Sequence, residues 1–577
     1  MAPAPSTPSF EVRTFHFSTA GIAAQLQVDR RFGNWPAVYV LADAKRIYVG
    51  ESLNVAIRLR QHKDSPEKQD LSDARVVLDE RFNKSAALDL ESFLIRLFAG
   101  DGRFQVLNRN DGITNSDYFD RDQYRAAFQD IFDHLRSLKL FEQSRTAIEN
   151  SDLFKLSPFK ALTADQEAAV ASIVGALLND LSGGSKTTSV VSGGPGTGKT
   201  VVGIYLMKLL SDLATGRADE TADAEAALSE FFTDDRRLQL KDLRLGLVIP
   251  QQSLRASVRK VFVKTPGLSR DMVLSPFDVG KASRGFDLLI VDETHRLMQR
   301  ANMPSAAQNK QFTDINMQLF GDDDVVHTQL DWIQHQSRHQ ILLLDAAQAV
   351  RPADLPTALL DELTARAERT HRKFELSSQM RVNAGGDYIE YVRQVLSNSP
   401  PAARATFEAY DLRLFDSVSE LRVALKECES HAGLARLVAG YAWPWKSKKD
   451  PEKHDIEIDG ESLRWNKTAV DWVNSPTSAD EVGSIHTIQG YDLNFAGVII
   501  GDDLRYDPVA KRLSFDRGSY YDTKGKENNP RIGRTYDDDD LFRFVTNIYA
   551  VLLTRGIRGT YVYATNPALR AYLRRYF

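Results

Sequence analysis

Residues 189–210, SVVSGGPGTGKTVVGIYLMKLL, place a short apolar strand, a glycine-rich loop and an apolar helix directly after one another. The loop fits the pattern GxxxxGK[ST], in which backbone N–H groups turn inward around phosphates at the start of a helix. We therefore expect a nucleoside triphosphate here, with Lys199 reaching its β- and γ-phosphates and Thr200 holding Mg²⁺. The predicted phosphate-binding residues are Gly193, Gly194, Pro195, Gly196, Thr197, Gly198, Lys199 and Thr200.

The chain on both sides of this loop alternates between strands and helices. Near-continuous apolar runs at 243–250, 286–293 and 339–348 are separated by helical patterns, and further strand patterns occur at 497–501 and 560–564. Such runs, alternating with helices, indicate parallel sheets that are covered on both faces. We therefore expect an α/β fold.

The run at 286–293, FDLLIVDE, ends in two adjacent acids. A strand of this kind delivers Asp292 and Glu293 to the carboxyl edge of a parallel sheet, where ligands bind in open α/β folds. We expect Asp292 to hold Mg²⁺, directly or through water, and Glu293 to polarise the attacking water. We interpret the neighbouring His295 as a hydrogen-bonded polar residue without a catalytic role.

Composition excludes several classes of protein. The 577 residues carry 73 Lys and Arg against 78 Asp and Glu, so the net charge of −5 requires any nucleic-acid site to be a local basic patch. The single cysteine, Cys428, cannot form an internal disulfide or a cysteine-built zinc site. The sequence has no signal-peptide pattern and no apolar run long enough for a membrane span. We expect a cytoplasmic, multidomain protein.

From about Leu156 to the C-terminus, the sequence resembles the superfamily 1 helicases, in particular the helicase-like domain of the Schlafen group. After the glycine loop and the two acids, further motifs occur in that family's order. They are LTADQ (162–166), IPQQSLRASVRK (249–260), LLLDAAQAVRP (342–352), LSSQMR (376–381), SIHTIQGYDLNFAGVII (484–500) and VLLTRGIRG (551–559). The resemblance implies ATP and Mg²⁺ as cofactors, DNA as partner and two RecA-like lobes, 156–373 and 374–577.

The same resemblance implies roles for individual residues. Gln166 would read adenine, Gln348 would sense the γ-phosphate, and Gly490 would couple the nucleotide to the nucleic-acid strand. Arg381 would face the phosphates and Arg555 would act as an arginine finger, neutralising charge on the transferring phosphoryl group when the lobes close. The sequence DAAQ at 345–348 departs from the family's usual third motif. This departure weakens the case for processive unwinding more than the case for ATP hydrolysis.

The N-terminal segment 35–62, WPAVYVLADAKRIYVGESLNVAIRLRQH, resembles the GIY-YIG nucleases. Tyr39 lies in AVY, in place of GIY, and Tyr48 lies in YVG, in place of YIG. Arg58 and His62 are four residues apart and share one face of a predicted helix. Glu91 matches that family's metal-binding glutamate, and Asn108, in FQVLNRN, matches its late asparagine. We assign 1–33 to a lead-in, 34–112 to the nuclease-like domain and 113–155 to a helical connector.

The resemblance implies phosphodiester cleavage at this N-terminal site. Glu91 would hold a single Mg²⁺ or Mn²⁺ that keeps several waters, and Arg58 would clamp a phosphate oxygen. Tyr39 or Tyr48 would orient or deprotonate the attacking water, which requires a tyrosine pKa lowered by a nearby cation. His62 would act as a proton shuttle.

Together these patterns favour an ATP-dependent DNA helicase or translocase that is coupled to a metal-dependent endonuclease, acting in defence against foreign DNA or in DNA repair. Single-stranded or branched DNA is the expected partner, with a homo-oligomer or defence proteins as further possible partners. Three alternatives stay open. The ATPase could be a switch that gates the nuclease without unwinding, the substrate could be RNA, or the N-terminal domain could bind nucleic acid without cleaving it.

Overall fold

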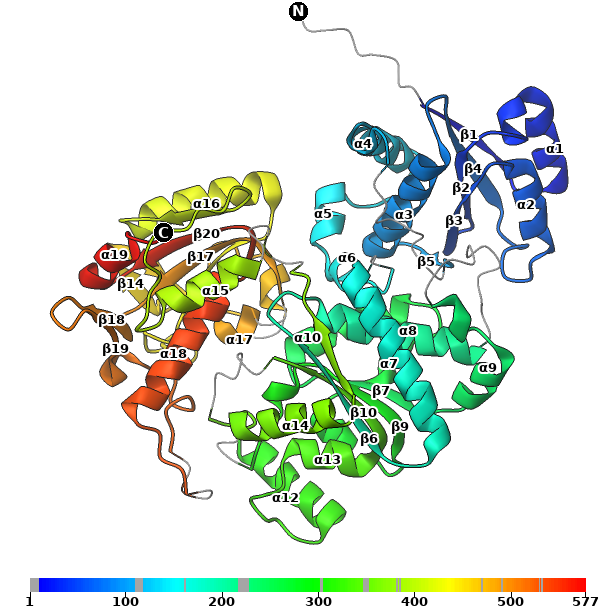
Figure 1. Cartoon of the computed structure of the whole chain (residues 1–577). Helices are drawn as coiled ribbons and strands as arrows, with labels where there is room; N and C mark the ends of the chain where they lie inside the picture. The colour runs from blue at the N-terminus through cyan, green and yellow to red at the C-terminus, as the bar shows by residue number, and fades with distance from the viewer. Residues whose placement is uncertain are drawn as a thin grey trace, which may run out of the picture. The chain divides into compact units, whose positions relative to one another are not determined.

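The computed structural model describes residues 10–108, 118–159, 162–215, 228–300, 305–345, 352–379, 382, 386–468, 471–488, 491–528, 530 and 533–577 (Figure 1). The chain forms two compact units. The first unit contains Met1–Thr163, Lys208–Leu238 and Val258–Arg270, and the second contains Ala164–Met207, Gln239–Ser257 and Asp271–Phe577. In the part of the chain that is described, no helix is long and apolar enough to cross a membrane.

The first unit is built around a five-stranded sheet with the order β1-β4-β2-β3-β5. Its strands are β1 (Phe10–His16), β2 (Ala37–Ala42), β3 (Arg46–Ser52), β4 (Asp73–Asp79) and β5 (Gln105–Val106). Neighbouring strands are antiparallel except for β3 and β5, which are parallel. The predicted lead-in therefore contributes to this sheet, because β1 pairs with β4 along its full length.

The helices of the first unit are α1 (Thr19–Val28), α2 (Val55–Asp64), α3 (Lys84–Asp101), α4 (Arg121–Ser137), α5 (Arg145–Asn150) and α6 (Asp152–Lys155). The helical connector predicted over 113–155 is divided into several helices. The helix α4 ends at Ser137, because Lys139 adopts a left-handed conformation with φ of 61°. A separate helix then begins after Ser144, whose side chain caps it by accepting the Ala147 N–H. The second unit shares with the first the helices α8 (Lys199–Thr215), α9 (Asp234–Leu240) and α10 (Gln252–Lys264).

The second unit contains two parallel sheets, as the apolar runs predicted. The first has the order β11-β6-β10-β9-β7-β8. Its strands are β6 (Thr187–Gly193), β7 (Leu245–Val248), β8 (Val273–Leu274), β9 (Phe286–Val291), β10 (Ser337–Leu344) and β11 (Lys373–Leu376). Its helices include α7 (Ala164–Gly183), α11 (Pro276–Gly280), α12 (Ala306–Phe320), α13 (Gln329–Gln336) and α14 (Thr357–Arg369). Only β10 separates β6 from β9, so the glycine loop and the two acids leave the same edge of the sheet.

The second sheet has the order β12-β20-β17-β13-β16. Its strands are β12 (Asp411–Leu414), β13 (Ala435–Ala439), β16 (Val482–Ser484), β17 (Leu493–Ile500) and β20 (Gly556–Ala564). The same part of the chain contains two hairpins. They are β14 (Ile456–Ile458) with β15 (Glu461–Leu463), and β18 (Leu504–Asp507) with β19 (Arg512–Phe515). The accompanying helices are α15 (Gly386–Val395), α16 (Val418–Ala432), α17 (Ile485–Ile488), α18 (Asp538–Leu553) and α19 (Pro567–Leu573).

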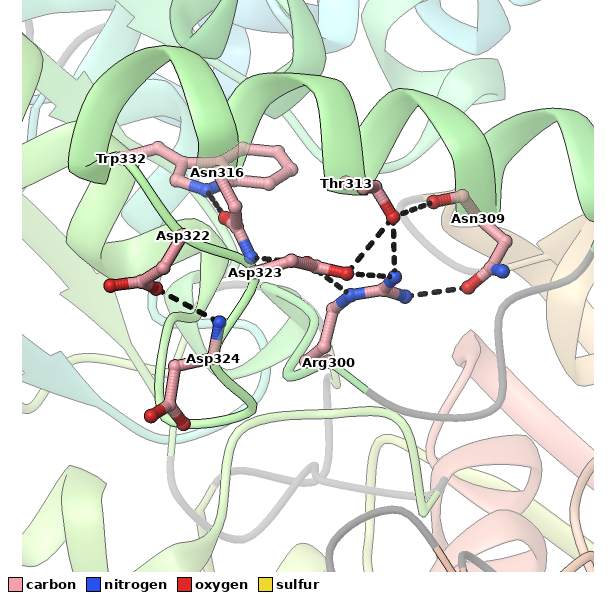
Figure 2. Close-up of polar contacts among 8 residues, drawn as sticks. All are labelled: Arg300, Asn309, Thr313, Asn316, Asp322, Asp323, Asp324 and Trp332. Atoms are coloured by element: carbon pink, nitrogen blue, oxygen red, sulfur yellow. Dashed lines mark hydrogen bonds and ion pairs between the residues drawn. The ribbon is translucent and has the colours of Figure 1, made fainter.

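A partly buried polar cluster joins the chain beyond β9 to the helices α12 and α13 (Figure 2). Arg300, whose side chain is 2% exposed, donates from Nε and Nη2 to the two carboxylate oxygens of Asp323, both at 2.9 Å. The hydrogen bond from Arg300 holds the pKa of Asp323 at about 2. The remaining members of the cluster are Asn309, Thr313, Asn316 and Trp332.

Arg300→Ala is expected to destabilise this insertion by about 1–3 kcal/mol, because it leaves the half-buried Asp323 carboxylate without its cation. Hydrogen exchange of α12 and α13 should speed up while exchange in β17 and β20 stays unchanged. The double variant R300A/D323N removes both charges and should recover part of the loss. Protection of α12 that is identical in Arg300→Ala and wild type would contradict the assigned role.

A buried carboxylate, Asp503, makes the stability of the lobe around β17 depend on pH. Asp503 is 1% exposed and accepts a 2.6 Å hydrogen bond from the Tyr549 hydroxyl, and burial raises its pKa to about 7. A raised carboxyl pKa contributes stability that is complete below the unfolded-state value of about 4 and is lost as the pH rises through about 7.

Asp503→Asn removes this titration while keeping an acceptor for Tyr549. The melting temperature of Asp503→Asn minus that of wild type should therefore be larger at pH 7.5 than at pH 5. The corresponding difference in the free energy of unfolding should change by at most about 1.4 kcal/mol per pH unit between these limits. Thermal melts at both pH values test this directly. A difference in melting temperature that does not change with pH would contradict the shifted pKa.

Candidate nucleotide site and N-terminal polar cluster

The glycine loop adopts a conformation that other residues could not easily reproduce. Gly196 and Gly198 have φ of 82° and 81°, in the left-handed region that favours glycine. A Cβ on Gly193 would lie 2.5 Å from Thr197 Oγ1. The strand β6 ends at Gly193 and α8 begins at Lys199, so the loop joins a strand to a helix N-terminus as its sequence predicted.

Lys199 is buried at the centre of the loop. Its Nζ donates to the carbonyl oxygens of Gly193 and Gly194 at 2.7 and 2.9 Å and lies 3.7 Å from Asp345 Oδ2. The ammonium group is therefore held by neutral carbonyls and by one distant carboxylate. Phosphate oxygens carry more charge than carbonyls, so an entering nucleotide can replace these partners.

Thr200 and Asp292 lie side by side at the same edge. Thr200 Oγ1 donates to Asp292 Oδ2 at 2.8 Å, and the Glu293 N–H donates to Asp292 Oδ1 at 3.0 Å. Burial, followed by the charge of Glu293, raises the pKa of Asp292 above its usual value. A hydroxyl and a carboxylate are hard oxygen ligands, so this pair fits Mg²⁺.

Two residues that the sequence interpretation left out join this arrangement. His295 is fully buried, and its Nε2 lies 2.9 Å from Glu293 Oε2, although without the alignment of a good hydrogen bond. Its Nδ1 accepts the backbone N–H of Asp345 at 3.4 Å, so the proton of the neutral ring is on Nε2 and faces Glu293. Asp345 follows β10 as Asp292 follows β9, and this strand-end position was the signal in the sequence.

Two glutamines contact the loop backbone. Gln166 is fully buried, and its Nε2 donates to the Thr197 carbonyl at 2.8 Å. Gln379, which the sequence interpretation did not single out, donates from Nε2 to the Pro195 carbonyl at 2.5 Å. The neighbouring Asp165 accepts the backbone N–H groups of Ser377 and Ser378 at 3.0 and 2.9 Å. Gln166 thus lies against the phosphate loop, and its contact with adenine remains a prediction.

The other predicted nucleotide contacts are placed only in part. Gln348, Arg381 and Gly490 lie outside the described residues. Arg555 is described and is 3% exposed, and its Nη1 donates to the Tyr491 carbonyl at 3.4 Å. This contact lies within the lobe that carries Arg555, so its role as an arginine finger also remains a prediction.

In the first unit, the N-terminal aromatic residues and His62 meet in a buried cluster. Tyr39 comes from β2, Tyr48 from β3 and His62 from α2, and each is less than 5% exposed. The Tyr39 hydroxyl lies 2.7 Å from His62 Nε2, and the ring centroids of Tyr48 and His62 are 5.0 Å apart. A Cβ on Gly50 would lie 2.3 Å from the Tyr39 hydroxyl oxygen, so glycine is required at this position.

The ionisation of this cluster differs from the expectation. Burial raises the pKa of Tyr39 well above its usual value, and the neighbouring Arg58 only partly opposes this effect. The predicted lowering of the Tyr39 pKa by a nearby cation is therefore wrong for this structure. Burial, followed by the charges of Lys68 and Arg58, lowers the pKa of His62 to about 3. His62 is therefore neutral near pH 7, and its Nε2 shares a hydrogen bond with the Tyr39 hydroxyl.

Arg58 and Glu91 lie next to this cluster. Both are half-buried, and both act electrostatically on Tyr39, Arg58 lowering its pKa and Glu91 raising it. Asn108 instead pairs with the Val49 backbone, donating to its carbonyl at 2.7 Å and accepting its N–H at 3.0 Å. Across the described residues, no three or more His, Cys, Asp or Glu side chains are placed to share a metal ion. A single carboxylate fits Mg²⁺, which usually keeps several of its waters.

Comparisons with known proteins agree with the nucleotide site. Residues 186–566 match the family model described as Schlafen group 3, DNA/RNA helicase domain. The uncharacterized protein YPL245W of Saccharomyces cerevisiae is 30% identical in an alignment of 220 residues that covers 35% of this chain and 48% of the yeast protein. This chain thus spans about half the length of that relative.

A solved structure described as a complex of arterivirus nonstructural protein 10, a helicase, with DNA aligns with 70% of this chain and 66% of the viral chain. The sequence identity is 14% and the TM-score is 0.27, a level that does not establish a shared fold. The assignment therefore depends on the family model, which covers more than half of the chain and includes the glycine loop and both acids. The chain belongs to the Schlafen group 3 DNA/RNA helicase domain family.

Proposed function

We propose that this protein is an ATP-driven helicase or translocase on DNA whose N-terminal domain is a GIY-YIG endonuclease that requires Mg²⁺ or Mn²⁺. The observation that carries the ATPase part is the meeting of Lys199, Thr200, Asp292 and Glu293 at one sheet edge in a helicase-family chain. The cluster of Tyr39, His62 and Tyr48 beside Arg58 and Glu91 supports the nuclease part.

In the ATPase reaction, Lys199 would bind the β- and γ-phosphates in place of the Gly193 and Gly194 carbonyls. Thr200 and Asp292 would hold Mg²⁺, which supplies positive charge against the phosphates. Glu293 would orient the attacking water, with His295 fixing its carboxylate from behind. Gln348, Arg381 and Arg555 would sense or stabilise the transferring phosphoryl group, and Gly490 would link it to the strand.

In the nuclease reaction, Arg58 would bind a non-bridging phosphate oxygen and Glu91 would hold the metal ion, whose charge stabilises the leaving oxygen. Tyr39 would position the attacking water through its hydroxyl. The Tyr39 hydroxyl shares a 2.7 Å hydrogen bond with Nε2 of neutral His62, so His62 would hold that hydroxyl in place beside the water. Burial raises the pKa of Tyr39 and lowers that of His62, so proton transfer between them is disfavoured and the pair would act by positioning the water.

We propose single-stranded or branched DNA as substrate, and defence against foreign DNA or DNA repair as the setting. ATP hydrolysis measured with and without single-stranded DNA, beside displacement of a labelled strand from a forked duplex, tests the motor. Hydrolysis stimulated by DNA together with displacement is expected. Stimulated hydrolysis without displacement or translocation would favour the nucleotide switch, and stimulation or cleavage confined to RNA would favour an RNA-directed enzyme.

A further inference from the structure

The segment that follows β13 forms a fixed surface element of the second unit. Asp455 is 2% exposed and accepts the Ser447 N–H at 2.7 Å through Oδ1 and the Trp465 N–H at 2.8 Å through Oδ2. These bonds tie the start of the segment to the hairpin β14–β15. The Asp455 carboxylate is therefore hydrogen-bonded within the segment and does not face solvent.

The outer face of this segment is basic in an acidic protein. Residues 446–453, KSKKDPEK, contain four lysines and two acids, whereas the whole chain has a net charge of −5. All four lysines are exposed. This local excess of positive charge is the kind of patch that a phosphate backbone requires in a chain of this composition.

A recess of about 620 Å³ opens among these side chains. Two of its lysines form weak, exposed ion pairs, Lys446 with Glu457 and Lys453 with Asp450, both at 3.5 Å. Lys449 forms no ion pair within the described residues. Exposed pairs of this kind contribute little free energy, so a polyanion can take over these lysines at small cost. The recess is lined by Lys446, Lys449, Asp450, Lys453, His454 and Glu457.

Aromatic rings lie in the same segment. Trp443 and Trp445 are half-buried, and the Lys448 ammonium lies 5.2 Å from the centroid of the Trp445 ring. The Trp445 indole donates to Ser447 Oγ at 3.0 Å, which fixes the ring beside the lysines. Bases of a single strand stack on such rings, whereas the paired bases of a duplex are not available for stacking.

The segment also lies at the edge of the sheet where we expect a nucleic-acid strand to bind. The strands β13 and β16 are parallel neighbours, so the chain leaves both at the same edge. β16 leads into residues 484–500, the segment that resembles a nucleic-acid-coupled helicase motif. The ring of Tyr441, after β13, lies 5.2 Å from that of His486, after β16.

We infer that residues 443–454 bind the backbone of single-stranded nucleic acid, with Lys446, Lys449 and Lys453 contacting phosphates and Trp445 stacking on a base. This inference rests on the proposed function, because it supplies a contact for the strand on which the motor would act. It requires no nucleotide in the phosphate loop. Binding at this site should therefore persist without ATP.

The test is the salt dependence of binding by the triple variant K446Q/K449Q/K453Q, measured by fluorescence anisotropy with a labelled single-stranded oligonucleotide. Affinity should fall at least about 10-fold, and the slope of log K against log salt should become shallower by about 2, because each lost contact to a single strand removes about 0.7. ATP hydrolysis in the absence of nucleic acid should stay at the wild-type rate. K446R/K449R/K453R should bind like wild type.

A variant with two exposed lysines changed elsewhere in the same unit, K281Q/K310Q, is the matched control and should keep the wild-type slope. If the triple variant loses its thermal transition, the three single lysine variants are measured instead. Each should account for about a third of the expected change in the salt slope. If all lysine variants bind with the affinity and the salt slope of wild type, this site is refuted and the proposed function still stands. Absence of binding by the wild type itself would overturn the proposed function instead.

Loss of binding to heparin with unchanged binding to the oligonucleotide would also overturn the assignment, because it would identify the patch as a general polyanion site. Trp445→Ala adds a second readout. It should weaken binding to a single strand several-fold while leaving the salt slope unchanged, since stacking releases no counterions. Equal weakening for a blunt duplex would contradict the stacking role.

Discussion

Lys199→Ala is expected to abolish ATP hydrolysis, with a loss of at least about 100-fold in turnover. The side chain is the only one in the described glycine loop that carries positive charge, and its Nζ lies where the Gly193 and Gly194 carbonyls converge. Without it, the β- and γ-phosphates lose their direct cation. Release of inorganic phosphate, measured at saturating ATP with and without single-stranded DNA, gives the result.

Lys186→Ala is the matched control, because this exposed lysine lies just before β6 and, among the described residues, donates to the Gln334 and His335 carbonyls. It should hydrolyse ATP at the wild-type rate. Near-normal turnover by Lys199→Ala would refute the assignment of the phosphate loop. Metal-dependent cleavage should remain measurable in Lys199→Ala, since the nuclease residues belong to the other unit.

Glu91→Ala and Arg58→Ala are expected to reduce cleavage of DNA by at least about 100-fold while leaving ATP hydrolysis within twofold of wild type. Glu91 is the one predicted metal ligand of the N-terminal site, and Arg58 is its predicted phosphate clamp. Both act electrostatically on the buried Tyr39, so both lie near the proposed site. Nicking of supercoiled plasmid with Mg²⁺ or Mn²⁺ measures the effect.

Arg60→Ala is the control for Arg58→Ala, because Arg60 is an exposed arginine two residues away on the same helix, α2. It should cleave at the wild-type rate. Cleavage that persists in both Glu91→Ala and Arg58→Ala would point to a different nuclease site. A wild type that binds DNA but never cleaves it would favour the N-terminal domain as a binding module.

The sequence predicted the parts of the fold that depend on local pattern. Apolar runs bounded by glycine loops or acids became β6, β9 and β10. The side chains of Lys199, Thr200 and Asp292 met as expected, because parallel strands bring their carboxyl ends to one edge.

The features that the sequence missed depend on contacts between distant segments. The pairing of β1 with β4 and the bond between His295 and the Asp345 backbone each join residues that are 50 or more apart. The acidic run at 537–540 depends on a local contact instead, because it begins α18, where Asp537 accepts the Asp540 N–H at 2.9 Å. Acids at a helix N-terminus are favoured by the helix dipole.

The pKa values in the N-terminal cluster could not be predicted for the same reason. A sequence shows that Tyr39 is near cations along the chain, but not that the phenol is 1% exposed. Burial therefore outweighed the charges that the sequence suggested.

The coupling of the two activities is tested most directly by cleavage of a forked duplex with Mg²⁺, with and without ATP, by wild type, Glu91→Ala and Lys199→Ala. We predict cleavage by wild type that changes in rate or position when ATP is added, no cleavage by Glu91→Ala, and cleavage by Lys199→Ala that no longer responds to ATP. Wild-type cleavage that is the same with and without ATP, or no cleavage under any condition, would contradict a nuclease controlled by this ATPase.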